Sequence, residues 1–160
     1  MKIFYALSLL WLASGLYAIE GAFIGMGAEA NANTRSGAAV GGSLVLGLDL
    51  TRNFALGLKT SFSHNTDTVG ALEPQALVRF QFPVKQTFPY VQAEIGCAVF
   101  FEDGGSYPAF LGGLGLGWRF HLGRSFYLEP SVRGGYPFAW GAGLNFGFYF
   151  NTLMLGSFKR

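Results

Sequence analysis

The sequence is short of charge, of cysteine and of long apolar runs. Only 12% of its 160 residues are charged, against about 25% in a typical soluble domain, so a water-facing globule would lack polar surface. The single cysteine, Cys97, excludes an internal disulfide. Beyond residue 18 there is no uncharged run of about 18 apolar residues, so no transmembrane helix is predicted.

Basic residues are also not in excess. The chain carries 11 Lys and Arg against 9 Asp and Glu, and this near-balance excludes the basic surface that nucleic-acid binding requires. What the chain has in abundance is 51% hydrophobic residues, 24 Gly and 17 Phe. This composition excludes disorder. Many apolar residues with few charges indicate that much of the surface faces lipid.

Residues 1–18 have the features of a signal peptide. Lys2 precedes an apolar run from residue 3 to 12, which is too short to span a bilayer, and small residues follow. We expect cleavage after Ala18, with Gly15 as the alternative, and a mature barrel domain over residues 19–160. No lipobox cysteine follows the run, so no lipid anchor is expected. The mature protein is therefore expected in the periplasm or beyond it.

From Gly21 onward, apolar and polar residues alternate in segments of about ten residues that are separated by turn-forming clusters. This period of two is typical of membrane β-barrel strands. The pattern predicts an all-β fold with eight antiparallel strands in a meander. The predicted strands are 21–32, 38–50, 54–63, 72–82, 88–101, 109–121, 126–135 and 139–150.

The connections between these segments alternate in character. Tight connections follow the second, fourth and sixth segments, and longer ones follow the first, third and fifth. Outer-membrane barrels have short periplasmic turns and longer extracellular loops, so the predicted loops are extracellular. The connection after the seventh segment is shorter than this rule predicts. Because the alternation continues beyond Phe150, the last strand ends near either Phe150 or Phe158.

Every segment keeps its charged residues on one face. Because eight strands enclose a lumen just wide enough for side chains, this face predicts a polar, side-chain-filled interior. Five acids against four bases is the near-balance that a sealed lumen needs. A charge facing lipid at the midplane would cost about 2–4 kcal/mol, and none is predicted there. The predicted lumen network is Glu29, Asp49, Lys59, Glu73, Arg79, Glu94, Arg119, Glu129 and Arg133.

Four runs resemble the small bacterial outer-membrane barrel superfamily that includes the OmpA transmembrane domain, OmpX and OmpW. They are PYVQAEIG at 89–96, LGGLGLGW at 111–118, LEPSVRGG at 128–135 and the aromatic closing run LNFGFYF at 144–150. The resemblance implies an outer-membrane location, a non-conducting barrel, and contact with periplasmic chaperones and the barrel-assembly machinery during biogenesis. Members usually end on an aromatic residue, whereas here Phe158 is followed by Lys159 and Arg160.

The residues that could support catalysis are predicted to have structural or solvent-exposed roles instead. Glu73 with Arg79, and Glu129 with Arg133, are interpreted as salt-bridged lumen pairs rather than acid–base catalysts. His64 lacks a neighbouring carboxylate for a triad and is predicted to be a solvated loop residue. We therefore expect no catalytic, cofactor-binding or metal-binding residue and no cofactor.

Two further residues complete this prediction. His121 has no second ligand at a metal-binding spacing and is predicted to be a hydrogen-bonded lumen residue. Cys97 falls on the apolar face and is predicted to touch lipid.

Aromatic residues gather near both ends of the predicted strands, which indicates two interfacial girdles in outer-membrane lipid. The predicted turn-end girdle is Phe54, Phe82, Phe88, Trp118, Phe120 and Phe126, and the loop-end girdle is Phe62, Phe101, Phe110 and Trp140.

The sequence thus favours a non-enzymatic outer-membrane protein with a structural or surface-interaction role. Its loops at 31–37, 64–70, 102–108 and 134–138 would face a surface ligand. One alternative is an OmpW-like channel for small hydrophobic molecules, which needs an apolar upper lumen. Another is a lipid A-modifying enzyme, which needs a rim triad.

Overall fold

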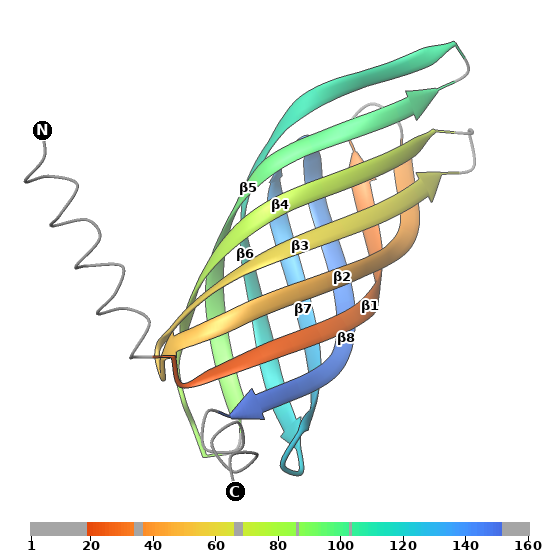
Figure 1. The fold of residues 1–160 in the computed structure, drawn as a ribbon. Coiled ribbons are helices and arrows are strands. Elements are labelled where there is room, and N and C mark those ends of the chain that lie inside the picture. The colour runs from red at the N-terminus through yellow and green to blue at the C-terminus, as the bar shows by residue number, and fades with distance from the viewer. Residues whose placement is uncertain (1–18, 34–36, 66–68, 86, 103, 152–160) are drawn as a thin grey trace, which may run out of the picture.

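The computed structural model describes residues 19–33, 37–65, 69–85, 87–102 and 104–151. Eight antiparallel strands follow one another around a closed barrel, and the last pairs with the first (Figure 1). This confirms the predicted all-β meander. The strands are β1 (Gly21–Asn33), β2 (Gly37–Thr51), β3 (Phe54–Asn65), β4 (Gly70–Gln81), β5 (Thr87–Glu102), β6 (Gly105–Leu122), β7 (Phe126–Tyr136) and β8 (Phe138–Asn151).

Closure of the barrel depends on its final hairpin. β7 and β8 pair from Phe126↔Phe148 to Arg133↔Gly141, and β8 pairs with β1 along most of its length. The count of eight strands is therefore correct. The predicted signal peptide, and the choice between Phe150 and Phe158 as the end of the last strand, involve residues outside those described.

The strands run further at the predicted loop end than the sequence suggested. β6 begins at Gly105 rather than at 109, and the residues left between strands at that end are 34–36, 66–69, 103–104 and 137. These connections are no longer than the turns at the other end, so the prediction of longer loops was wrong. Backbone pairing with a neighbouring strand continues the ladder through residues whose side chains do not alternate.

One hairpin projects beyond the rest of the wall. β5 and β6 pair out to Glu102↔Gly105, whereas pairing between β6 and β7 begins only at Gly112↔Tyr136. Figure 1 shows this hairpin reaching furthest from the barrel. Residues 105–111 therefore pair on one side only among the described residues.

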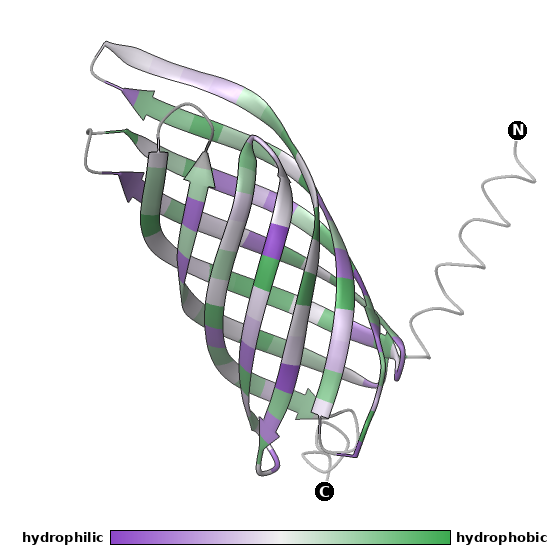
Figure 2. Ribbon diagram, turned by 180° about the vertical axis from the view of Figure 1, so that it is seen from behind, coloured by the Kyte–Doolittle hydropathy of each residue, from purple (hydrophilic) through white to green (hydrophobic). Residues whose placement is uncertain are grey.

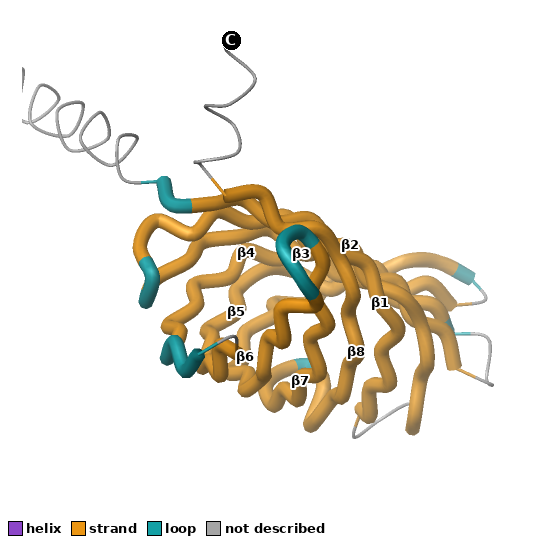
Figure 3. The backbone as a smooth tube through the Cα atoms, turned by 90° about the horizontal axis from the view of Figure 1, so that it is seen from below, coloured by secondary structure: helices purple, strands orange, loops and turns teal. Residues whose placement is uncertain are grey.

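The outward face of the barrel is apolar. Large hydrophobic side chains are exposed all round it, with Leu114 at 71% and Leu58 at 64%. Figure 2 shows hydrophobic and hydrophilic residues alternating along the strands, and Figure 3 shows the strands arranged around the barrel axis. A surface of this kind suits lipid and not water. The described part of the chain contains no helix long and apolar enough to cross a membrane.

Exposed aromatic side chains lie toward both ends of the strands. At the turn end, Trp118 stacks on Phe120 at 5.8 Å, and Phe126 packs against Phe148 at 4.6 Å between ring centroids. Phe88 does not belong to this girdle as predicted. It alternates with the buried Tyr90 and contacts the His121 ring, because even-numbered residues of β5 face the lumen.

Candidate functional site

All nine charged residues predicted for the lumen have their side chains inside the barrel. Eight are buried, and the Arg133 side chain is 11% exposed. They form two groups along the barrel axis. The turn-end cluster is Asp49, Arg79, Arg119 and Glu129, and the loop-end cluster is Glu29, Lys59, Glu73, Glu94 and Arg133.

Glu129 on β7 is the centre of the turn-end cluster. It accepts two hydrogen bonds from Arg79, each 2.9 Å, one from Arg119 Nε at 2.8 Å and one from the Tyr90 hydroxyl at 2.9 Å. The two bonds from Arg79 engage both carboxylate oxygens, which is the strong bidentate geometry. Asp49 adds a longer contact of 3.9 Å to Arg119.

Aromatic rings complete the surroundings of both buried guanidinium groups. Arg79 lies 3.7 Å from the Tyr90 ring centroid, and Arg119 lies 4.0 Å from that of Phe23. The negative ring faces attract the cations where water has little access. These contacts fix both arginines in place.

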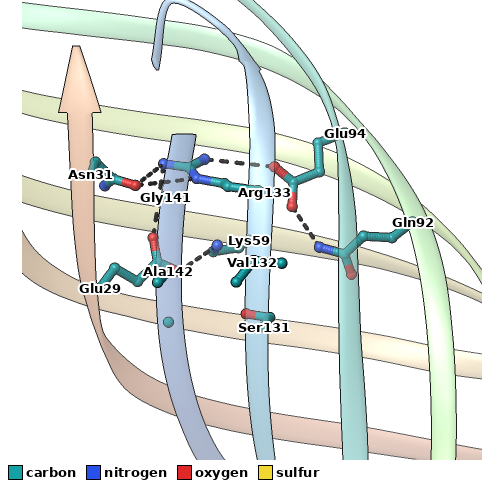
Figure 4. Close-up of a pocket in the computed structure, with 11 residues that line it drawn as sticks. Glu29, Asn31, Lys59, Gln92, Glu94, Ser131, Val132, Arg133, Gly141 and Ala142 are labelled. Atoms are coloured by element: carbon teal, nitrogen blue, oxygen red, sulfur yellow. Dashed lines mark hydrogen bonds and ion pairs between the residues drawn. The ribbon is translucent and has the colours of Figure 1, made fainter. Parts of the chain in front are cut away.

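Arg133 on β7 organises the loop-end cluster. Its Nη2 lies 2.7 Å from Glu73 Oε2. Its Nη1 lies 3.6 Å from Glu94 Oε2, and Figure 4 shows this ion pair. Lys59 forms an ion pair with Glu29, and Arg133 also donates to Asn31 Oδ1 at 3.0 Å. The cluster thus joins five strands with side chains that meet in the middle of the lumen.

Gln92 links the two clusters. Its Oε1 accepts from Arg79 at 2.9 Å, and its Nε2 donates to Glu94. The polar network is therefore continuous from Asp49 to Asn31. Sequence reasoning did not assign Tyr90, Gln92 or Asn31 to this network, although all three share the parity of the charged residues.

The predicted ion pairs within single strands are wrong. Glu73 pairs with Arg133 and Glu129 pairs with Arg79, the reverse of the expected partners. Glu73 and Arg79 share a face of β4 but lie six residues apart, which is about 20 Å along a strand. The closed barrel instead brings β4 and β7 to face each other across the lumen.

Apolar clusters pack beside the charged network and toward the loop end. One cluster consists of Phe23, Val45, Ala55, Leu77 and Tyr127, and a second, toward the loop end, of Ala71, Ala98, Phe100, Leu111 and Phe138. The space beside Arg133 has room for about one water molecule. The described lumen is therefore filled by side chains.

The two histidines and the cysteine lie apart from each other. His64 is exposed and belongs to β3, opposite Val40, so its predicted place in a loop was wrong. His121 is half-buried, with its ring edge-on to Phe88 and Tyr149 at 5.0 and 5.1 Å. Cys97 is half-buried opposite Phe110. Within the described ranges, no three His, Cys, Asp or Glu residues are grouped to hold a metal.

Comparisons with known proteins show where this fold occurs. No protein-family model and no curated protein matches the sequence. Among solved structures, the N-terminal β-barrel domain of Pseudomonas aeruginosa OprF is 23% identical, with a TM-score of 0.63 over 82% of this chain and 98% of that one. These values show a shared fold.

Two further outer-membrane barrels have the same fold. Outer membrane protein OprG of Pseudomonas aeruginosa has a TM-score of 0.67 at 11% identity, covering 83% of this chain and 97% of that one. Neisserial surface protein A has a TM-score of 0.62 at 15% identity, covering 82% and 96%. The chain therefore has the fold of the small eight-stranded outer-membrane barrels, as the sequence resemblance implied.

Proposed function

We propose that the protein is an integral outer-membrane barrel with a structural or surface-interaction role, that it is not an enzyme, and that it does not conduct ions. The observation that carries this proposal is the continuous side-chain network through the lumen. Its apolar exterior and its fold support the membrane location. Periplasmic chaperones and the barrel-assembly machinery are the partners expected during its assembly.

The lumen opposes conduction in two ways. An ion would have to separate pairs such as Arg79–Glu129, whose side chains are each 2% exposed. It would also have to pass the apolar layer around Phe100 and Phe138. Breaking a buried ion pair costs about 3–5 kcal/mol, and an apolar layer offers an ion no replacement for its water shell.

Planar bilayer recording tests this proposal. The full chain, shown to be folded by a heat-dependent shift in electrophoretic mobility, is expected to give no steady conductance. A general porin recorded in the same bilayer is the positive control. Arg133→Ala removes the side chain that joins Glu73 and Glu94 but leaves the Arg79–Glu129 pair and the apolar layer in place, so it is also expected to stay closed. Steady nanosiemens-scale steps from the unaltered protein would overturn the proposal.

One observation favours the OmpW-like alternative, passage of small hydrophobic molecules through the wall. Beside the last pair between β6 and β7 lies a small pocket lined in part by Leu111, Tyr136 and Phe138. The nearby Arg133 and Glu94 oppose an apolar route from there into the lumen. Uptake of a fluorescent hydrophobic solute by vesicles containing the protein, compared with empty vesicles, separates this alternative from a closed barrel.

A lipid-modifying activity has a direct assay. His64 is the exposed rim histidine, and the acid nearest the same end of the described barrel exterior is Glu102 on the β5–β6 hairpin. We expect the lipid A mass spectrum to be the same with and without the protein. A protein-dependent loss or gain of an acyl chain would contradict the non-enzymatic role.

A further inference from the structure

The basic residues of the described chain have only two locations. Four lie in the lumen, and each of the other three lies on one of the tight turns. Arg52 follows β2, Lys85 follows β4 and Arg124 follows β6, and all three are exposed. We call these three residues the basic collar. Glu20, just before β1, is the exposed acid at the same end.

At the opposite end, the one exposed charged residue that the structure describes is the acid Glu102. Among the described residues, the turn end therefore has three exposed bases and one exposed acid, whereas the loop end has no exposed base. This separation places the attraction for an anionic partner at the turn end.

The aromatic girdle sets the depth of the collar in a membrane. Phe82 is three residues from Lys85, and Phe54 is two residues from Arg52, distances of at most about 10 Å. Aromatic rings prefer the interface, and the headgroup layer is about 5–8 Å thick on each side. The collar bases are thus held at the level of the lipid phosphates, which their long side chains can reach.

Lys85 also has an unusual backbone conformation. Its φ is +58°, in the left-handed region where Gly, Asn and Asp are the usual residues. Local turn preference therefore does not favour lysine at this position.

We propose that the basic collar, Arg52, Lys85 and Arg124, binds the phosphates of anionic phospholipids in the leaflet at the turn end of the barrel. The inference rests on the proposed membrane-spanning barrel. It assigns a lipid preference to one rim of that barrel. Each base near an anionic bilayer contributes about fivefold to binding, so several anionic lipids are expected to be held beside the turns.

Quenching by brominated lipids measures this preference at each rim. Trp118 lies on β6 four residues before Leu122, between the turns that carry Lys85 and Arg124, whereas Trp140 lies near the other end. Full-length chains with Trp11 and Trp140 replaced by Phe report the collar rim, and chains with Trp11 and Trp118 replaced report the other. Each is folded into phosphatidylcholine vesicles containing brominated phosphatidylglycerol or brominated phosphatidylcholine.

At Trp118 we expect the quenching to show a preference for phosphatidylglycerol over phosphatidylcholine of about fivefold or more. At Trp140 we expect the two lipids to quench about equally. The triple variant Arg52→Gln, Lys85→Gln, Arg124→Gln is expected to abolish the preference, as is 0.5 M salt. The matched variant Arg52→Lys, Arg124→Lys is expected to retain it, because charge and not guanidinium geometry attracts the headgroups.

Equal quenching at both rims, or a preference that survives the triple substitution, would overturn the collar. A heat-dependent shift in the electrophoretic mobility of each sample shows whether the barrel has folded, independently of its lipid preference. A chain that never folds in either lipid would contradict the proposed membrane barrel. A folded barrel without lipid preference would contradict only the collar.

Discussion

Replacing Glu129 by Gln gives the most informative test of the sealed lumen. This carboxylate accepts four hydrogen bonds of 2.8–2.9 Å, from Arg79, Arg119 and Tyr90. Among the described residues it is the one hydrogen-bond acceptor of Arg119, whose guanidinium carbon lies 4.0 Å from the Phe23 ring centroid. Gln has nearly the same volume but no charge, so it leaves Arg119 with Asp49 at 3.9 Å as its nearest carboxylate and leaves Arg79 with the neutral Gln92.

The expected loss of stability follows from that arrangement. Hydrogen bonds to a charged group contribute about 1.5–3 kcal/mol each, but Gln still accepts one or two of them. Removing one partner of a buried ion pair costs about 3–5 kcal/mol, and we expect a loss of that size in the free energy of unfolding.

Urea unfolding of the barrel in phospholipid vesicles, followed by tryptophan fluorescence and by electrophoretic mobility, measures the change. Glu102→Gln on the exposed hairpin is the matched control and should change stability by less than about 0.5 kcal/mol. If Glu129→Gln costs less than about 1 kcal/mol, water reaches the arginines and the lumen is not sealed.

Two other substitutions test the packing and the lipid face. In Gly47→Ala the new methyl group would lie 2.1 Å from the Phe23 ring, so we expect the free energy of unfolding to fall by about 1–3 kcal/mol in the same urea assay. In the control Gly42→Ala the nearest atom to the new methyl group is 3.4 Å away, so we expect a loss under about 0.5 kcal/mol. Leu114→Arg puts a charge on the most exposed apolar position and should cost about 2–4 kcal/mol, whereas Val84→Arg at a turn should cost at most about 1 kcal/mol. Equal losses for Gly47→Ala and Gly42→Ala would contradict the lumen face assigned to Gly47. Equal losses for Leu114→Arg and Val84→Arg would contradict the lipid face assigned to Leu114.

The strand pattern could be predicted from the sequence because a barrel strand has only two faces. Leu114 and Arg119 have opposite parity on β6, and the structure puts the first in the lipid-facing surface and the second in the lumen. The strand ends were less predictable. Tyr107 and Pro108 do not alternate, and they join β6 only because β5 supplies a pairing partner.

The partners within the lumen could not be predicted from parity. The alternation along each strand predicts that the Arg79 and Glu129 side chains point inward. Whether the two side chains contact each other depends on the stagger of their strands, and the two residues lie 50 positions apart in the chain. The sequence favours neighbours along one strand, whereas side chains in a narrow barrel reach across it. The same limit hid the role of Gln92, a neutral residue that belongs to the network through its position alone.

The projecting β5–β6 hairpin has a consequence for crowding in the membrane. Pro89 on β5 lies opposite Trp118 on β6, but its carbonyl accepts a hydrogen bond from the Phe82 N–H on the β4 side. Trp118 is therefore not hydrogen-bonded to Pro89, and the backbone groups of Trp118 and of the other even-numbered residues of β6 point away from β5. Ser106, Pro108 and Phe110 therefore form the unpaired edge. Pro108 has no N–H, so a strand from a neighbouring molecule meets a missing donor at the centre of that edge. Proline thus protects this exposed ladder from pairing with other chains.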